Sequence, residues 1–212
     1  MRIGIFGGCF DPIHLGHLLI AEDVFRKLHL DRIIFIPTFY PPHRKKTIVT
    51  YHHRIAMVQL AIAHHPAFSV SRIEETIPTP SYTSETLLAL KKQLPRDSLY
   101  LLIGSDQYRT MSSWHHPTAL TRRARLVVMT RPGFPCPQLF PGHNPRRVLF
   151  VNVIPVSLTA TMIRQRLAKA MSICYLVPTK VAEYIYQNRL YRTPVEDETQ
   201  ELTRTGEKNK RN

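Results

Sequence analysis

Short apolar runs alternate with longer segments of helical periodicity along most of the chain. The apolar runs predict buried strands at residues 2–6, 31–37, 68–73, 99–103, 126–129 and 148–153. Segments whose apolar residues recur every three or four positions predict helices at residues 15–30, 50–64, 84–94, 161–169 and 181–188. Strands separated by helices favour a parallel sheet, so we expect an α/β fold with a Rossmann-like, doubly wound sheet and helices on both faces.

The predicted topology also places the functional edge of the molecule. Open parallel sheets bind their ligands at the carboxyl ends of the strands, near the point where the strand order reverses. We therefore expect the loops after Phe6, Pro37, Ile103 and Val153 to carry the site.

The length and composition predict one domain followed by a tail. A chain of 212 residues with 43% hydrophobic residues can bury one sizeable core, so we expect a single domain over residues 1–192. Residues 131–147 are rich in proline and predict a loop. Residues 193–212 are polar and mixed in charge, which predicts a disordered tail.

The composition also argues against several classes of protein. No run approaches the roughly 20 apolar residues of a membrane span, and the apolar N-terminal run is too short for a signal peptide, so we expect a soluble, cytoplasmic protein with no membrane partner. Cys9, Cys136 and Cys174 form no C-x-x-C pair, which disfavours a disulfide framework or a zinc cluster. The net charge of +14 is compatible with a phosphate-rich ligand, but also with a solvated basic surface.

Residues 7–17, which we call the signature segment, join the first predicted strand to the first predicted helix with the sequence Gly-Gly-Cys-Phe-Asp-Pro-Ile-His-Leu-Gly-His. Gly7 and Gly8 let backbone amides approach a ligand closely, and the helix N-terminus supplies oriented N–H groups. His14 and His17 lie three residues apart, so their rings share one face of the first helical turn. Gly16 costs about 1 kcal/mol of helix propensity relative to alanine, as expected if a bulky group packs there. The segment predicts a polyphosphate site.

Other interpretations of the signature segment are weaker. As metal ligands, the two histidines lack a third ligand at a suitable spacing. As capping or core residues, they would leave the glycines and the position after the first strand unexplained. The chain contains neither a G-x-x-x-x-G-K-[ST] sequence nor a complete G-x-G-x-x-G, which disfavours a P-loop ATPase and dinucleotide binding of the dehydrogenase type.

The signature segment resembles the motif of the HxGH nucleotidyltransferases, and the details resemble the bacterial nicotinate-mononucleotide adenylyltransferases, which act in NAD biosynthesis. Further segments match motifs of that family in the same order: residues 41–44, 80–87, 103–106 followed by Trp114, 131–133 and 159–164. The resemblance spans residues 2–191. It implies adenylyl transfer from Mg-ATP to nicotinate mononucleotide, giving nicotinate adenine dinucleotide and pyrophosphate.

The resemblance also implies roles in binding ATP. His14, His17 and Arg164 would be the catalytic residues, with His17 the main stabiliser of the transition state and Arg164 gripping the β- and γ-phosphates. Mg²⁺ would arrive with ATP, held by phosphates and water rather than by protein ligands. The expected ATP-binding residues are Gly7, Gly8, Cys9, Phe10, His14, Gly16, His17, His43, Arg44, Gly104, Asp106, Thr159, Thr161, Ile163 and Arg164.

Binding of the acceptor is implied for a second set of residues. Trp114 would stack on the pyridine ring, backbone amides near Thr83 and His115 would hold the carboxylate, and Asp106 would meet a ribose hydroxyl. Cys9 stands where the family usually has threonine or serine, and Thr159 replaces a serine, so the finer acceptor contacts are open. The full expected set is Ser81, Tyr82, Thr83, Asp106, Trp114, His115 and Arg131.

The sequence is also compatible with other functions. Within the enzyme class, the acceptor could be nicotinamide mononucleotide or phosphopantetheine, or the chain could resemble the glycerol-phosphate-type cytidylyltransferases. From another class, the basic charge fits a nucleic-acid-binding module, whose affinity would fall steeply with salt. No nucleic-acid recognition motif is present, so we expect small-molecule partners alone. The sequence does not define the oligomeric state.

Overall fold

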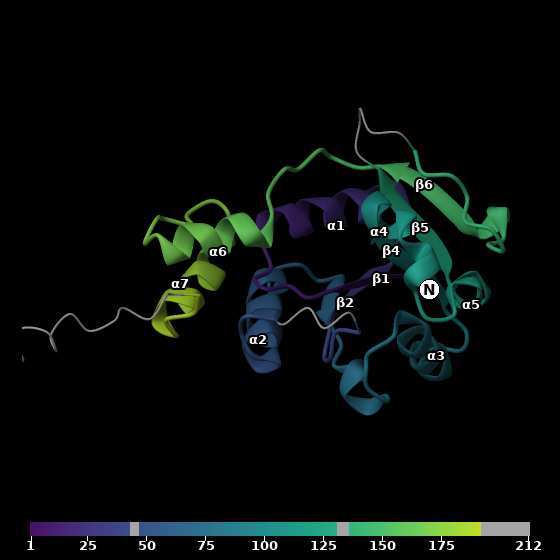
Figure 1. Ribbon diagram of the computed structural model, residues 1–212, viewed down its shortest axis with the longest axis horizontal. Helices are drawn as coiled ribbons and strands as arrows, with labels where there is room; N and C mark the ends of the chain where they lie inside the picture. The colour runs from purple at the N-terminus through teal and green to yellow at the C-terminus, as the bar shows by residue number, and fades with distance from the viewer. Residues whose placement is uncertain (43–46, 131–135, 192–212) are drawn as a thin grey trace, which may run out of the picture.

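The computed structural model describes residues 1–42, 47–130 and 136–191. Within these residues, six parallel strands form one sheet in the order β3–β2–β1–β4–β5–β6 (Figure 1). The order reverses between β1 and β4, so the expected α/β doubly wound sheet is confirmed. The strands are β1 (Arg2–Gly8), β2 (Arg32–Pro37), β3 (Phe68–Val70), β4 (Ser98–Gly104), β5 (Arg125–Thr130) and β6 (Val148–Asn152).

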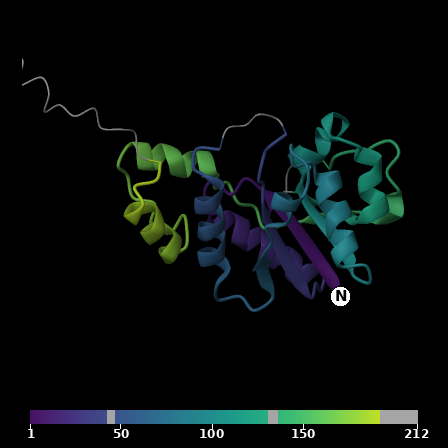
Figure 2. The ribbon, with the colours of Figure 1, turned by 90° about the horizontal axis from the view of Figure 1, so that it is seen from below.

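Helices connect the strands and cover both faces of the sheet (Figure 1, Figure 2). The α-helices are α1 (Leu15–Lys27), α2 (Tyr51–Ile62), α3 (Thr83–Gln93), α4 (Ser105–Arg109), α5 (Pro117–Arg123), α6 (Ala160–Ala168) and α7 (Thr179–Gln187). The described residues also form the short 3-10 helices η1 (Ile73–Thr76), η2 (Met111–Ser113) and η3 (Pro145–Arg147). Among the described residues, no helix is long and apolar enough to cross a membrane.

Each face of the sheet has its own hydrophobic core, because successive side chains of a strand point to opposite faces. On one face, buried residues of β1, β2, β4 and β5 pack against α1, α2, α6 and α7. On the other face, the alternate residues of the same strands pack against α3, α4 and α5. Both views place α6 and α7 beside α2, at the opposite end of the molecule from α3 and α5 (Figure 1, Figure 2).

The long elements agree with the sequence predictions to within a few residues, whereas the short ones do not. The strand predicted at residues 68–73 ends at Val70, because Ile73 begins η1. Helices α4 and α5 were not predicted, since 5 and 7 residues are too few to show a helical period. In the proline-rich segment, residues 136–144 form no helix or strand, and η3 begins at Pro145.

Several predicted features lie outside the described residues. They are the candidate ATP-binding residues His43 and Arg44, the candidate acceptor-binding residue Arg131, and the tail at residues 193–212. The single domain over residues 1–192 stays a prediction. No disulfide joins Cys9, Cys136 or Cys174.

Candidate active site

The signature segment begins at the carboxyl end of β1 and ends in the first turn of α1, as predicted. His14 is the residue that precedes α1, with an extended backbone, and its N–H donates to Nδ1 of His17 at 3.3 Å. The two imidazole rings stack, with their centroids 3.7 Å apart and their planes 27° from parallel. The chain therefore brings its two signature histidines into direct contact.

Burial keeps both histidines neutral near pH 7. Burial lowers the pKa of His14 to about 4. Burial, and secondly the neighbouring His14, lower the pKa of His17 well below its ordinary value. Because Nδ1 of a neutral His17 accepts the N–H of His14, the proton of His17 sits on Nε2. That N–H is available as a donor to a ligand.

The packing around the pair explains the small residue between them. A Cβ on Gly16 would lie 3.0 Å from Nδ1 of His14 and 3.0 Å from a methyl group of Val156. Phe10 is buried, has a φ of 48°, and contacts His17 edge-on with ring centroids 5.1 Å apart. The bulky group that packs on Gly16 is thus the imidazole of His14 together with Val156, both from the protein itself.

Arg164 reaches the signature segment from α6. Its guanidinium donates to the carbonyl oxygen of Asp11 at 2.7 Å and to Oγ1 of Thr161 at 3.2 Å. Thr159 caps α6, because its Oγ1 accepts the N–H of Met162 at 3.2 Å. Ile163 is fully buried in the core, so its side chain faces away from solvent. Arg164 thus joins α6 to the signature segment through its side chain.

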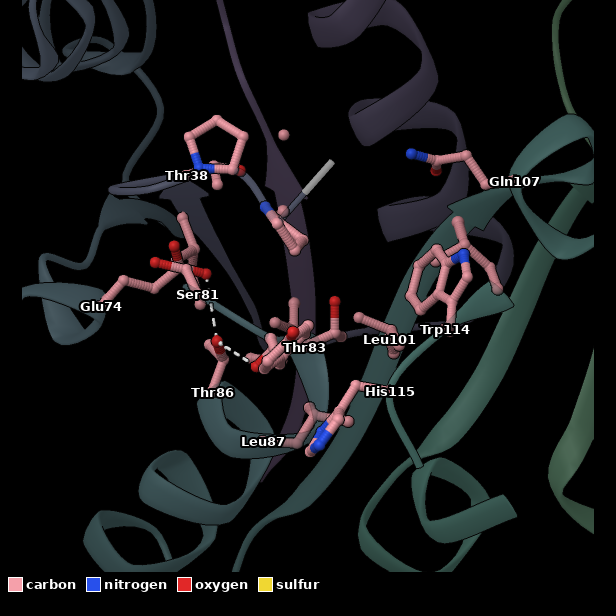
Figure 3. Close-up of a pocket in the computed structure, with 18 of the residues that line it drawn as sticks. Thr38, Glu74, Ser81, Thr83, Thr86, Leu87, Leu101, Gln107, Trp114 and His115 are labelled. Carbon is pink, nitrogen blue, oxygen red and sulfur yellow. Dashed lines mark hydrogen bonds between the residues drawn. The ribbon is translucent and has the colours of Figure 1, made fainter. Parts of the chain in front are cut away.

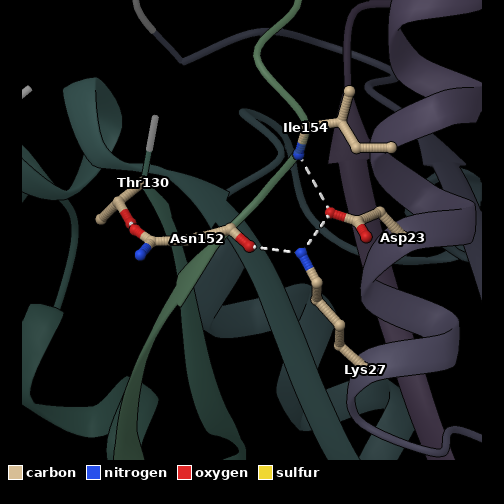
Figure 4. A network of polar contacts seen from close by, with 5 residues as sticks. All are labelled: Asp23, Lys27, Thr130, Asn152 and Ile154. Atoms are coloured by element: carbon tan, nitrogen blue, oxygen red, sulfur yellow. Dashed lines mark hydrogen bonds and ion pairs between the residues drawn. The ribbon is translucent and has the colours of Figure 1, made fainter. Parts of the chain in front are cut away.

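A polar clasp fixes the linker between β6 and α6 to the side of α1 (Figure 4). The Asp23 carboxylate accepts Lys27 Nζ at 2.9 Å and the N–H of Ile154 at 3.0 Å. Lys27 Nζ also donates to the carbonyl oxygen of Asn152 at 2.8 Å, and Thr130 donates to the side chain of Asn152 at 2.6 Å. The clasp therefore fixes the linker that leads to Arg164 against α1, the helix whose first turn contains His17.

A cavity of about 370 Å³ opens beside the first residues of the signature segment, at the carboxyl ends of β1, β2 and β4 (Figure 3). Its walls come from the three strands, the loop after β2, η1, α3, α4 and the turn that holds Trp114. Tyr82 and His115 stack at 4.2 Å, and His115 Nδ1 lies 3.3 Å from Oγ of Ser84, which joins α3 to that turn. The cavity lies on the functional edge that the strand order predicts.

The cavity separates the predicted residues into two groups. Its lining includes the candidates Gly7, Gly8, Cys9, Ser81, Tyr82, Thr83, Trp114 and His115. The described candidates outside the lining are Phe10, His14, Gly16, His17, Gly104, Asp106, Thr159, Thr161, Ile163 and Arg164. Asp106 is exposed on α4, where a Cβ on Gly104 would collide with its carboxylate. All the described acceptor candidates except Asp106 thus line one cavity, and the catalytic candidates lie beside it.

The cavity wall also contains polar residues outside the predicted site residues. Glu74 is buried, and it accepts the N–H of Phe39 at 2.9 Å and Oγ1 of Thr86 at 3.0 Å (Figure 3). Burial raises the pKa of Glu74, an effect opposed by these hydrogen bonds and by Arg54. Thr38, Gln107, Thr110 and Ser113 line the cavity as well. Glu74 begins a Glu-Glu-Thr sequence whose other two residues are exposed, so no local pattern predicts its burial.

Protein ligands for a metal are not gathered at this site. Among the described residues, no three or more His, Cys, Asp or Glu side chains form a group that could hold a metal ion.

The sequence comparisons match the chain over most of its length. A family model described as cytidylyltransferase-like matches residues 5–166. A protein of Thermus thermophilus named "Probable nicotinate-nucleotide adenylyltransferase" is 42% identical over 192 residues, which cover 91% of this chain and 100% of that protein. A protein of the same name from Carboxydothermus hydrogenoformans is 34% identical over 197 residues, covering 90% of this chain and 98% of that protein.

Solved structures share the fold. The nicotinic acid mononucleotide adenylyltransferase of Plasmodium falciparum complexed with NaAD has a TM-score of 0.72 at 21% identity, covering 90% of this chain and 97% of that one. The same enzyme complexed with APC has a TM-score of 0.70 at 20% identity, covering 90% and 96%. The sequence matches, rather than these distant structures, define the relationship: this chain belongs to the cytidylyltransferase-like family and, within it, to the nicotinate-nucleotide adenylyltransferases.

Proposed function

We propose that this chain transfers the adenylyl group of ATP to nicotinate mononucleotide, forming nicotinate adenine dinucleotide and releasing pyrophosphate. The observation that carries the proposal is the cavity of about 370 Å³ whose wall runs through Gly7, Gly8 and Cys9, directly before the stacked histidines. Such an arrangement offers one compartment for an acceptor and, beside it, hydrogen-bond donors for a polyphosphate. The names of the relatives support this pair of substrates.

In the cavity, the acceptor meets an aromatic ring and the first turn of a helix. Trp114 lines the cavity and suits stacking on a pyridine ring. Thr83 is the first residue of α3, and the first N–H groups of a helix have no partner within the helix, so they bind a carboxylate well. This proposed position for the acceptor carboxylate favours nicotinate over nicotinamide.

The chemical step is a direct displacement at phosphorus. An oxygen of the acceptor phosphate attacks the α-phosphorus of ATP, and the bond from that phosphorus to the oxygen bridging to the β-phosphate breaks. Pyrophosphate leaves with the electron pair of that bond. Because the second pKa of a phosphate monoester is about 6, the attacking oxygen is already ionised at neutral pH and needs no general base.

The protein contributes position and hydrogen bonds to this step. His17 donates from Nε2 to an oxygen of the reacting phosphates, where negative charge builds up in the transition state. Arg164 has used donors for Asp11 and Thr161, and its remaining N–H groups serve the β- and γ-phosphates. Mg²⁺ bound to the phosphates of ATP supplies further charge neutralisation.

The experiment is a pyrophosphate-release assay with Mg-ATP and three acceptors offered separately: nicotinate mononucleotide, nicotinamide mononucleotide and phosphopantetheine. We expect strong preference for the first. His17→Ala should lower kcat about 100-fold, as the loss of one transition-state donor does in other enzymes. His64→Ala, which removes an exposed histidine after α2, is the matched control and should stay within about twofold of the parent. Preference for another acceptor would refute the proposed substrate, and full activity of His17→Ala would refute the proposed role.

A further inference from the structure

Asp11, in the middle of the signature segment, has both carboxylate oxygens bound by distant parts of the chain. It is buried, with 6% of its surface exposed. Its Oδ2 accepts the N–H of Ile48 at 2.6 Å, and its Oδ1 accepts the hydroxyl of Tyr191 at 2.7 Å. The first contact spans 37 residues and the second spans 180. A residue of the signature segment is thereby fixed to the last residue that the structure describes.

Two arginines hold the backbone of the same loop. Arg164 of α6 donates to the carbonyl oxygen of Asp11 at 2.7 Å, and the buried Arg54 of α2 donates to the carbonyl oxygen of Cys9 at 2.8 Å. In the loop before the stacked histidines, Ile48 and Tyr191 therefore bind the side chain of Asp11, and the two arginines bind the backbone. We call these five residues, Asp11, Ile48, Arg54, Arg164 and Tyr191, the Asp11 anchor.

Tyr191 combines an unfavourable backbone conformation with a buried side chain. Its φ is 63°, in the left-handed region that is unfavourable for a bulky side chain. Its ring is nevertheless buried, with 8% of its surface exposed, in the core that includes α6 and α7. Burial, followed by the Asp11 carboxylate, raises the pKa of Tyr191, so its hydroxyl stays a donor. Surrounding contacts must offset the cost of this backbone conformation.

We propose that Tyr191 is a positioning residue for adenylyl transfer, acting through Asp11 on Arg164 and the two signature histidines. The hydroxyl of Tyr191 fixes the Asp11 carboxylate, the Asp11 carbonyl fixes the guanidinium of Arg164, and His14 follows Asp11 by three residues. The inference rests on the proposed function, because it assigns Arg164 and the histidines to the phosphates of ATP. Tyr191 acts through these residues rather than by touching a substrate.

The geometry predicts which kinetic constant changes. The Asp11 anchor includes residues of α2 and α6 and Tyr191, and these two helices and Tyr191 pack on one face of the sheet. Trp114 packs on the other face, and neither it nor Thr83 is part of the anchor. Loosening Asp11 should therefore misplace the groups around the phosphates while leaving the acceptor compartment intact. We expect kcat to fall and the KM of the acceptor to stay unchanged.

The test is Tyr191→Phe, which removes one hydroxyl and keeps the ring. We expect kcat to fall about tenfold, with the acceptor KM within about twofold, since a hydrogen bond to a charged group is lost. Tyr184→Phe is the matched control: Tyr184 lies on α7, and its hydroxyl bonds Nδ1 of His53 on α2 at 2.9 Å, outside the anchor. Each variant loses one tyrosine hydroxyl that has a hydrogen-bond partner, buried for Tyr191 and part-buried for Tyr184. Equal kcat values for the two variants and the parent would overturn the proposal.

A second readout separates this proposal from the proposed function. In protein labelled with ¹⁵N at its histidine rings, Tyr191→Phe should shift the signals of His14 and His17, and Tyr184→Phe should shift that of His53 alone. The spectra need no turnover, so they test the positioning role even if nicotinate mononucleotide is not the acceptor. Unchanged His14 and His17 signals in Tyr191→Phe would overturn the proposal, and absent turnover by the parent protein would overturn the proposed function alone.

The pairing of Tyr191 with Asp11 can be tested by a double-mutant cycle. Asp11→Asn keeps the size of the side chain but offers one acceptor oxygen in place of two. We expect it to lower kcat, and we expect the combined variant with Tyr191→Phe to be little worse than Asp11→Asn alone, because both changes break the same contact. Fully additive losses would show that the two residues act independently.

Discussion

The two signature histidines differ in the hydrogen-bonding capacity that the fold leaves them. Nδ1 of His17 accepts the N–H of His14, so its tautomer is fixed and Nε2 is a donor. Nδ1 of His14 is buried and has no hydrogen-bond partner among the described residues. Leaving such an atom unsatisfied costs free energy, on the order of 1–3 kcal/mol, and a ligand or water that reached it would recover part of this. The pair therefore combines one oriented donor with one buried atom that lacks a partner.

Folded-state burial of His14 makes the stability of the protein depend on pH. The pKa of His14 falls from 6.5 to about 4 on folding, so the unfolded chain binds its proton first as the pH drops. The folded state keeps its full stability above about pH 6.5, where His14 is neutral in both states. The free energy of unfolding then decreases as the pH falls toward 4, and the loss at pH 5 is about 2 kcal/mol. Urea unfolding at pH 7.5 and pH 5 should show a loss larger by about that amount in the parent than in His14→Asn. Equal losses in the two proteins would contradict the assignment.

For single residues, the sequence predicted those inside motifs but not the distant residues that hydrogen-bond to them. The signature segment, Trp114 and the first turn of α3 follow from their local patterns. Glu74 does not, because its burial depends on Phe39, 35 residues away in the chain, and on Thr86 across η1 and α3. Likewise, Asp11 could be recognised as part of a motif, but its contact with Tyr191 spans 180 residues. Long-range hydrogen bonds of single side chains leave no periodic trace in a sequence.

Among the elements, α6 depends on contacts outside itself. It is 9 residues long, which is marginal for a helix without tertiary support. Thr159 caps its first turn, Ile163 and Leu167 bury its apolar side, and the clasp at Asp23 fixes the linker before it. The position of Arg164 thus depends on α1 as well as on its own helix.

Asp23→Ala should destabilise the protein by about 1–2 kcal/mol, because Ile154 loses its acceptor and Lys27 loses one of two partners. The matched control is Arg26→Ala on the same helix, which breaks a solvent-exposed ion pair with Glu22 and should cost less than about 0.5 kcal/mol. Urea unfolding of both variants measures the difference. Similar values for the two would mean that the clasp contributes no more than an ordinary surface ion pair.

Elements could be predicted from the sequence in proportion to their length. Helices α1, α2 and α3 have 11–13 residues and show clear apolar faces, and the buried strands are continuous apolar runs. Helix α4 follows β4, and α5 follows a turn. Both are too short to show an apolar face in the sequence. Their positions are set by packing against the sheet, where Tyr108 and Leu120 are buried. Tertiary contacts, rather than periodicity, define these short helices.

For the molecule as a whole, the sheet divides the proposed site between its two faces. The helices that carry His17 and Arg164, α1 and α6, pack on one face, and α3 and the turn of Trp114 pack on the other. The strand order reverses at β1, and the last two residues of β1, Gly7 and Gly8, line the cavity together with Cys9 from the loop that follows. Two substrates held by opposite layers would meet at this edge. The net charge of +14 attracts the phosphates of both.

The direct test of this account follows the oxygen atoms of the acceptor. The protein is incubated with Mg-ATP and with nicotinate mononucleotide whose phosphate oxygens are labelled with ¹⁸O. The products are then separated, and their masses are determined by mass spectrometry. If the acceptor phosphate attacks the α-phosphorus, all the label appears in nicotinate adenine dinucleotide and the pyrophosphate is unlabelled. Label in pyrophosphate, or formation of ADP in place of pyrophosphate, would contradict adenylyl transfer as the reaction of this site.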